Sequence, residues 1–131
     1  MNIDGKAWRT IWLEPGGRSI GVIDQTVLVA RDPHGWRPLV VGRLGDGWVF
    51  ASESCALDIV GATLEREVQP GEIVTIDDTG MSATQALTPA PIHRCVFEHV
   101  YFARPDSVVF GGSVDRSRRA LGRQLARECP A

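Results

Sequence analysis

Short runs of β-branched and aromatic residues, separated by turn-forming residues, fill the first two thirds of this chain. Residues 20–23 and 26–30 flank a two-residue polar break, which predicts an antiparallel hairpin. Residues 38–41 and 48–51 flank Gly45-Asp46-Gly47, where glycine supplies the positive φ of a tight turn. Turn signals this closely spaced constrain the chain to antiparallel sheets.

The next two predicted strands, residues 64–68 and 72–76, are joined by Gln69-Pro70-Gly71, a sequence typical of a type II turn. Asp77-Asp78-Thr79-Gly80 then leads into a weak strand at residues 81–87. An apolar strand followed by two acidic residues also has the outline of a phosphate-binding loop. Such a loop needs several consecutive backbone N–H groups, and this turn is too short for them, so a hairpin is the favoured interpretation.

One short helix is predicted within the strand-rich region. Ser52 can cap a helix over residues 53–60, and Gly61 can adopt the left-handed conformation that ends it. The core-facing side chains of this helix are expected to be Ala56, Ile59 and Val60.

The C-terminal third begins with Thr88-Pro89-Ala90-Pro91, whose prolines predict a rigid linker. Residues 95–103 are apolar at nearly every position, which predicts a strand buried on both faces. A helix is predicted over residues 114–128, with Val114, Leu121 and Leu125 on one face. The other face is expected to carry solvated arginines at positions 116, 119, 123 and 127.

The first fifteen residues carry the weakest pattern. Trp8, Ile11 and Trp12 have helical spacing, but Pro15-Gly16-Gly17 would end any helix at once. We expect the tryptophans to dock on another part of the protein.

Composition limits the functional class. With 131 residues and 44% apolar content the chain can bury one core, which indicates a single small soluble domain. A net charge of −2 gives no attraction to nucleic acid or to a membrane surface, and no apolar run reaches membrane-spanning length. Cys55, Cys95 and Cys129 are odd in number and far apart, which indicates reduced thiols and a cytoplasmic location.

Candidate chemistry from the residues themselves is sparse. His34, His93 and His99 and the three cysteines match no metal-ligand spacing, so no resident metal is expected. Ser52, Ser54 and Cys55 lie at a strand-to-helix junction, as hydrolase nucleophiles do, but the flanking glycines of a nucleophile elbow are absent. An independent small enzyme using Cys55 or His99 is the weakest of the functional hypotheses.

Five blocks of the chain, in order, resemble the glutamine phosphoribosylpyrophosphate (PRPP) amidotransferase family. They are Ala30-Arg31-Asp32-Pro33-His34-Gly35 with Arg37-Pro38-Leu39, residues 51–54 with 56–58, residues 68–73, residues 95–98 with 100–107 ending in Arg104-Pro105-Asp106-Ser107, and the helix through Leu121-Gly122 to Ala126-Arg127-Glu128. The last four residues of the fourth block are the most specific. The resemblance implies the second half of an N-terminal-nucleophile (Ntn) glutaminase domain, an α+β fold with an antiparallel β-sandwich between helices, plus a C-terminal helix.

The resemblance also implies a division of the chain. It consists of a poorly defined segment at residues 1–15, a partial glutaminase scaffold at 16–88, and a linker, buried strand and helix at 89–131. The last part would lead toward a phosphoribosyltransferase domain that this sequence lacks.

No catalytic residue is expected in this sequence. The family's nucleophile is an N-terminal cysteine whose own α-amine is the base, whereas Asn2 follows Met1 here. Tyr101, Arg104 and Asp106 match the segment that joins the family's two catalytic domains. The alternative interpretation of the same residues is a buried aromatic side chain and two paired charges in a strand. Cys95 matches an iron–sulfur ligand of some members, and the family uses Mg²⁺ with PRPP, but no cofactor is expected for this chain.

Two hypotheses lead. The first is a truncated or split relative of the family, inactive in glutamine-dependent purine synthesis unless a complementary chain supplies the rest. The second is a non-enzymatic module that self-associates as a homo-oligomer through exposed sheet edges. Arg31 and Asp32 are interpreted as residues that hold a strand–turn–strand unit over residues 29–44, not as substrate contacts.

Overall fold

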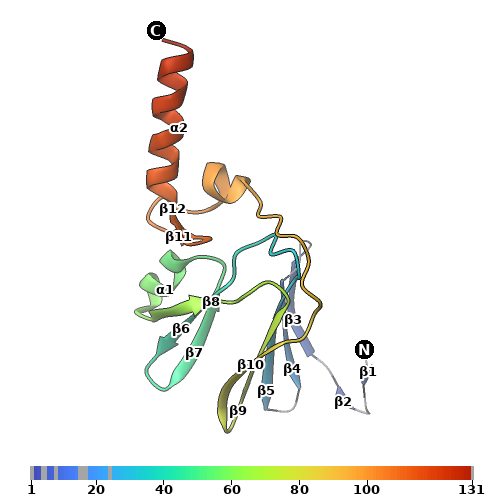
Figure 1. Ribbon diagram of the computed structural model, residues 1–131. Helices are drawn as coiled ribbons and strands as arrows, with labels where there is room; N and C mark the ends of the chain where they lie inside the picture. The colour runs from blue at the N-terminus through green and yellow to red at the C-terminus, as the bar shows by residue number, and fades with distance from the viewer. Residues whose placement is uncertain (1, 4–5, 8, 15–17, 24, 131) are drawn as a thin grey trace. The chain divides into compact units, whose positions relative to one another are not determined.

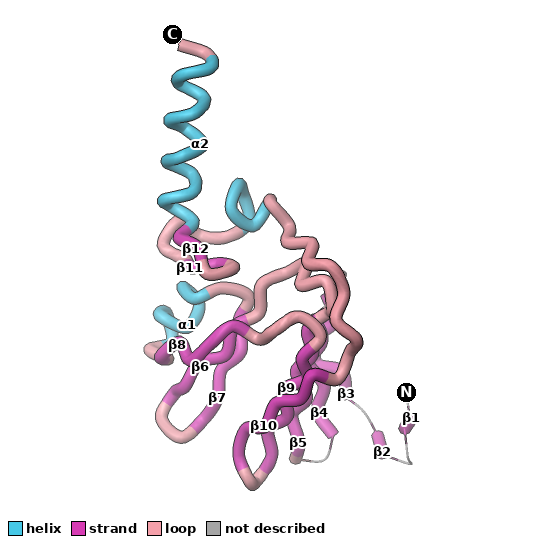
Figure 2. Tube along the Cα trace, in the orientation of Figure 1, coloured by secondary structure: helices cyan, strands magenta, loops and turns pink. Residues whose placement is uncertain are grey.

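The computed structural model describes residues 2–3, 6–7, 9–14, 18–23 and 25–130. The elements form two compact units, residues 1–37 with 68–94 and residues 38–67 with 95–131. The α+β class, the antiparallel sheets and the C-terminal helix are confirmed (Figure 1 and Figure 2). The stacking of two sheets and the domain boundaries at residues 15 and 88 stay predictions.

The strands of the first unit are β1 (Asn2–Ile3), β2 (Lys6–Ala7), β3 (Arg9–Glu14), β4 (Arg18–Ile23), β5 (Thr26–Arg31), β9 (Glu72–Asp77) and β10 (Gly80–Gln85). Five of them form an antiparallel sheet in the order β10-β9-β5-β4-β3. The hairpins β4–β5 and β9–β10 are confirmed. Val29 of β5 lies opposite Val74 of β9, and both are fully buried with Val68, so the core of this unit is built from β-branched side chains.

The helical spacing near the N-terminus does not produce a helix. Residues 9–14 form β3, which pairs with β4 and contains a bulge between Thr10 and Trp12. Trp8 and residues 15–17 lie outside the described residues. Pairing with a neighbouring strand gives the backbone of this short segment its hydrogen bonds, which a helix ended by Pro15 could not extend.

The second unit contains a sheet in the order β7-β6-β8. Its elements are β6 (Val40–Leu44), β7 (Gly47–Ala51), α1 (Ser54–Val60), β8 (Thr63–Glu67), the π-helix η1 (Glu98–Phe102), β11 (Val108–Val109), β12 (Gly112–Ser113) and α2 (Val114–Glu128). The β6–β7 hairpin is confirmed, with Gly45 at φ +57°. Leu57 of α1 packs with Val40 and Ala62. A Cβ at Gly42 would lie 2.9 Å from Leu57 Cδ1, so glycine in β6 lets the helix approach the sheet.

Two pairs of consecutive strands do not pair with each other. The segment 29–44 was predicted as strand, turn and strand, but β5 and β6 belong to different sheets, and so do β8 and β9. Eight residues, including Pro33 and Pro38, separate β5 from β6. That length and those prolines permit the chain to leave one sheet and enter another, because no tight turn forces adjacent pairing.

Helix α1 ends as predicted and begins differently. Gly61 adopts φ +73° and donates its N–H to Asp58 O at 3.1 Å. The cap residue is Glu53, not Ser52, and the buried face is Ser54, Cys55 and Leu57. The expected core residues Ile59 and Val60 are instead 70% and 49% exposed, because the N-terminal turn of this short helix faces the rest of the unit.

The predicted buried strand at residues 95–103 is wrong. Residues 98–102 form η1, and Phe97, Val100 and Tyr101 are 57%, 45% and 78% exposed. Only Glu98 and Ala103 of this segment are buried. A continuous apolar run has no periodicity that separates strand from helix, and its burial depends on which surfaces cover it.

Helix α2 is confirmed over residues 114–128, and the Ser113 side chain caps it by accepting from Arg116 N at 3.3 Å. Val114 is fully buried, but Leu121 and Leu125 are 54% and 62% exposed. The arginines predicted to face solvent are exposed. Beyond Arg118, α2 extends away from the rest of its unit (Figure 1). None of the helices in the described residues is long and apolar enough to cross a membrane.

Candidate functional site

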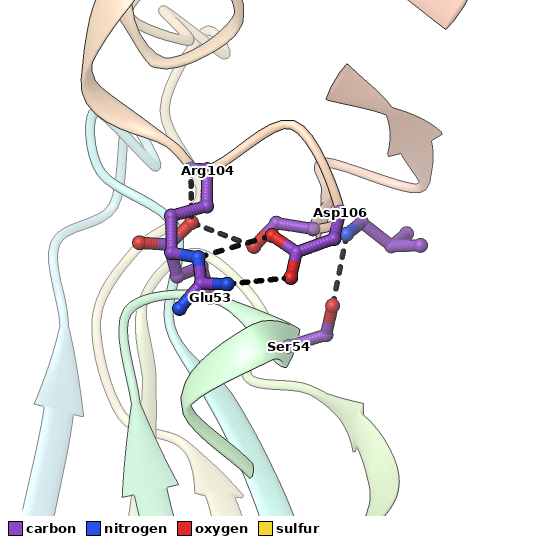
Figure 3. Close-up of polar contacts among 6 residues, drawn as sticks. Glu53, Ser54, Arg104 and Asp106 are labelled. Carbon is purple, nitrogen blue, oxygen red and sulfur yellow. Dashed lines mark hydrogen bonds and ion pairs between the residues drawn. The ribbon is translucent and has the colours of Figure 1, made fainter. Parts of the chain in front are cut away.

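A polar network joins the start of α1 to the segment that follows η1 (Figure 3). Glu53 precedes α1, and its Oε2 accepts from Arg104 N at 2.8 Å and from Ser107 Oγ at 2.7 Å. Ser54 Oγ accepts from Val108 N at 2.9 Å. The carboxylate and hydroxyl therefore satisfy backbone donors more than fifty residues away in sequence, and they fix the 104–108 segment on the helix end.

Cys55 lies inside this network as a buried thiol, 3% exposed. Burial raises the pKa of Cys55, and Glu53 adds to that effect, while a hydrogen bond with Ser107 and the nearby Arg104 oppose it. A raised pKa keeps the neutral thiol at pH 7, and the thiolate is the nucleophilic form. Cys55 is therefore a structural thiol rather than an activated one.

The structure brings two of the predicted site residues, Arg104 and Asp106, together. The Arg104 guanidinium donates Nε to Asp106 Oδ1 at 3.1 Å and Nη2 to Oδ2 at 2.8 Å, a bidentate pair. The two charges are paired, as one of the two interpretations has it, but their side chains are 54% and 55% exposed and they lie outside the strands of the described residues. Tyr101, the third predicted residue, is 78% exposed, so the interpretation as a buried aromatic residue is wrong; its ring meets the Phe102 ring edge-on, with centroids 5.8 Å apart.

The remaining candidates do not form a reactive centre. Cys95 is half-buried, and the described residues contain no group of three or more His, Cys, Asp or Glu side chains that could hold a metal ion. An iron–sulfur cluster needs about four ligands, so Cys95 would need partners from outside the described residues. The His99 ring lies 6.1 Å from the Phe110 ring, and His99 O accepts from Arg118 Nε at 2.8 Å. The Arg118 contact holds η1 against α2.

A second polar cluster belongs to the first unit, in the loop after β5. Arg31 is 2% exposed, and its guanidinium donates to Val68 O and to Gly35 O. The Asp32 carboxylate accepts from His34 N at 2.9 Å and Trp36 N at 3.1 Å. Both side chains thus bind their own loop, and Arg31 also binds Val68 in the segment before β9, in agreement with the interpretation that they hold this segment in place.

The loop also contacts the linker before residue 95. His93 N donates to His34 O at 2.9 Å, and the Trp36 ring stacks on His93 with centroids 5.4 Å apart. The His34 ring nitrogen Nδ1 lies 2.9 Å from Pro91 O. The linker predicted from Thr88 to Pro91 is therefore followed by residues anchored to the loop.

Two structural roles have no counterpart in the sequence pattern. Glu53 accepts from Arg104 N and Ser107 Oγ, and Arg118 Nη2 donates to Ala103 O at 2.7 Å. Both residues bind carbonyl or amide groups far away in the chain. Nothing in local spacing indicates such partners, because they are chosen by the tertiary fold.

The known proteins whose sequences resemble this chain include several amidophosphoribosyltransferases. No protein-family model matches it. The chain is 53% identical over 107 residues to the amidophosphoribosyltransferase of Mycobacterium tuberculosis H37Rv, an alignment covering 82% of this chain and 20% of the relative. It is 52% identical over 118 residues to amidophosphoribosyltransferase 2, chloroplastic, of Arabidopsis thaliana, covering 88% of this chain and 21% of the relative. The chain thus spans about a fifth of the length of these curated relatives.

Solved structures give the same match in three dimensions. The glutamine PRPP amidotransferase of B. subtilis, in complex with ADP and GMP, superposes with a TM-score of 0.82 and 42% identity. The superposition covers 87% of this chain and 25% of that one. A second solved structure, that of the allosteric regulatory enzyme of purine biosynthesis, matches with the same TM-score of 0.82 and covers 24% of its chain.

Proposed function

Over the segment that it covers, this chain is a homologue of the amidophosphoribosyltransferases, and on that premise we propose that it supplies the second half of a glutaminase scaffold. The observation that carries the proposal is the superposition with TM-score 0.82 at 42% identity. In that role the chain takes part in the glutamine-dependent first step of purine synthesis only together with the rest of the enzyme.

The 131-residue polypeptide by itself is proposed to have no glutaminase and no phosphoribosyltransferase activity. Amide hydrolysis by a thiol needs a thiolate, a base and oxyanion donors. Cys55 is buried and has a raised pKa, which disfavours the thiolate. Loss of one oxyanion donor alone costs about 10²–10³ in rate, and the described residues offer no activated thiol beside such donors, so we expect no measurable turnover.

The proposed contact with the rest of the enzyme runs through Tyr101, Arg104 and Asp106. Tyr101 is mostly exposed, and the Arg104–Asp106 pair projects from a segment anchored by Glu53. Exposed aromatic and arginine side chains on an anchored segment suit an interface, because little side-chain order must be gained on binding. Mg²⁺ and PRPP would be bound by the remaining polypeptide, and this chain would carry no cofactor of its own.

The first experiment tests the pure chain. Incubation with glutamine should release no more ammonia than a blank without protein. Release above the blank, in proportion to the chain's concentration, would show that the polypeptide has a catalytic site of its own.

The second experiment tests the scaffold role by complementation. The chain is coexpressed with a B. subtilis amidotransferase from which the matched segment has been deleted, and glutamine-dependent activity is measured. Activity should appear with the wild-type chain and fall with Arg104→Ala/Asp106→Ala. The matched control Arg119→Ala/Asp115→Ala removes another exposed pair, with a 2.7 Å ion contact, and should leave the activity unchanged. Equal losses in both variants would contradict the assigned interface.

A self-associating, non-enzymatic module is the alternative function. The edge strands β7 and β10, which carry no charged residue, favour this function. The partner would be a second copy of the chain rather than nucleic acid or a membrane. In either role we place the chain in the cytoplasm, where its three free cysteines would stay reduced.

A further inference from the structure

The two larger sheets each have one protected edge strand and one unprotected edge strand. In the first sheet β3 is interrupted by a bulge between Thr10 and Trp12. In the second, β8 pairs with a register shift and carries the charged sequence Glu65-Arg66-Glu67. Bulges and charges on edge strands discourage pairing with another chain. The opposite edges, β10 and β7, have neither feature.

Of the two unprotected edges, β10 is the accessible one. Residues 48–51 of β7 are half-buried against their own unit. In β10 every residue except Met81 is exposed, and all six residues pair with β9 without a break in register. Among the described residues no strand pairs with the outer side of β10. Its outward N–H and C=O groups therefore form a regular, open ladder edge.

We propose that β10 pairs antiparallel with β10 of a second copy of this chain, so that the two five-stranded sheets become one continuous sheet. Pairing along the full strand places Ser82 opposite Ala83 of the second copy, and Met81 opposite Thr84. No charged residue occurs in the sequence Gly80-Met-Ser-Ala-Thr-Gln85, so no like charges oppose one another along the strand.

Charge also selects the antiparallel orientation. The turn before β10 contains Asp77 and Asp78, both exposed. A parallel pair would bring the two acidic turns together, whereas an antiparallel pair places each turn near the uncharged residues that follow β10 of the other copy. The whole chain has a net charge of only −2, which gives little long-range repulsion between copies.

A second copy is favoured as the occupant because the edge is self-complementary. Small uncharged side chains face small uncharged side chains, and a two-fold axis gives both strands the same contacts. This pairing defines the alternative function and does not rest on the glutaminase proposal. The β10 pairing is tested by measuring association of the chain, whereas the glutaminase proposal is tested by complementation. Failure of one proposal can therefore be told apart from failure of the other.

The first test measures mass by light scattering over a wide concentration range. The wild-type chain should rise from 14.3 kDa toward twice that mass. Ser82→Lys/Ala83→Lys places ammonium groups along the edge and should weaken association at least about tenfold. Ala120→Lys/Gln124→Lys adds the same charge at exposed positions of α2 and should associate like the wild type. A strictly monomeric wild type, or equal effects of both variants, would overturn the proposal.

The second test follows amide hydrogen exchange in the unmodified chain and needs no variant. Residues 80–85 should become protected as the concentration rises, while β8 should not change. Association without protection of β10 would show that another surface is used. Protection of β10 only after addition of the deleted B. subtilis amidotransferase would assign the edge to the complementary polypeptide and refute the second copy.

Discussion

Replacing Gly71 with alanine should destabilise the first unit more than the same replacement at another glycine of similar φ. Gly71 follows Pro70 in the turn before β9. Its N–H lies 3.0 Å from Asp32 O, and its carbonyl accepts from Ala86 N at 3.2 Å and Leu87 N at 3.0 Å. The residue therefore joins the loop after β5 to the chain that leaves β10.

The loss of unfolding free energy in Gly71→Ala is the sum of two separate costs. Gly71 has φ +79°, and a left-handed conformation costs an L-residue about 1–2 kcal/mol. A Cβ at Gly71 would lie 2.5 Å from Gln85 Nε2 and 3.2 Å from Leu87 O. The amide of Gln85 can move, but the backbone carbonyl cannot do so freely, and overpacking of this kind costs about 1–3 kcal/mol. The expected total is about 2–5 kcal/mol.

Gly61 provides the matched control. It has φ +73°, but a Cβ there would meet nothing within 4 Å. Gly61→Ala should therefore show only the conformational cost, about 1–2 kcal/mol. The difference between the variants, about 2 kcal/mol, measures the steric contact alone.

The assay is urea unfolding of both variants at unchanged m value, supported by thermal melting. For a chain of this size, about 2 kcal/mol corresponds to a difference in Tm of roughly 6–10 °C. A Gly71→Ala variant within about 0.5 kcal/mol of Gly61→Ala would refute the steric reasoning, because the two sites would then differ by no more than ordinary surface positions.

Three further predictions concern single groups. Glu53→Ala should cost about 2–3 kcal/mol in urea unfolding because two donors lose their acceptor, and Glu53→Gln about half as much because one oxygen remains; equal losses would contradict the role of the charge. Cys129 should be alkylated first and Cys55 last at pH 7, since burial raises the pKa of Cys55; equal rates would mean that Cys55 is accessible as thiolate. The hydrogen bonds from Thr79 lower the pKa of Asp77, so its stabilising effect should be present above the ordinary value of about 3.9 and lost as pH falls through the lowered value. An NMR titration should show this midpoint moving up in Thr79→Val, and an unmoved midpoint would exclude the hydroxyl as the cause.

Much of the local structure was predictable from the sequence because its causes are local. Glycine at positions 45 and 61 adopts the positive φ that the turn and the helix end require. The alternation of apolar and turn residues located β4, β5, β9 and β10, and helical spacing located α2. Five blocks of residues also identified the family that the comparisons then showed.

The candidate site was predictable only as a set of residues. Arg104 and Asp106 were named from the resemblance, but their bidentate pairing and exposure were not. Glu53 as the acceptor for Arg104 N and Ser107 Oγ was missed because its partners are more than fifty residues away. Sequence spacing carries no record of such contacts.

By itself the sequence determined the strands from β4 to β10, the tight turns and the C-terminal helix, since each depends on neighbouring residues, and five blocks of residues indicated the resemblance to a family. Tertiary structure decided which strands share a sheet, which face of α1 is buried and what becomes of residues 95–103. The apolar run at Phe97, Val100 and Tyr101 has the composition of a core strand, yet it forms a π-helix with exposed side chains. Burial is a relation between surfaces, and a hydrophobic residue is buried only where another part of the molecule covers it.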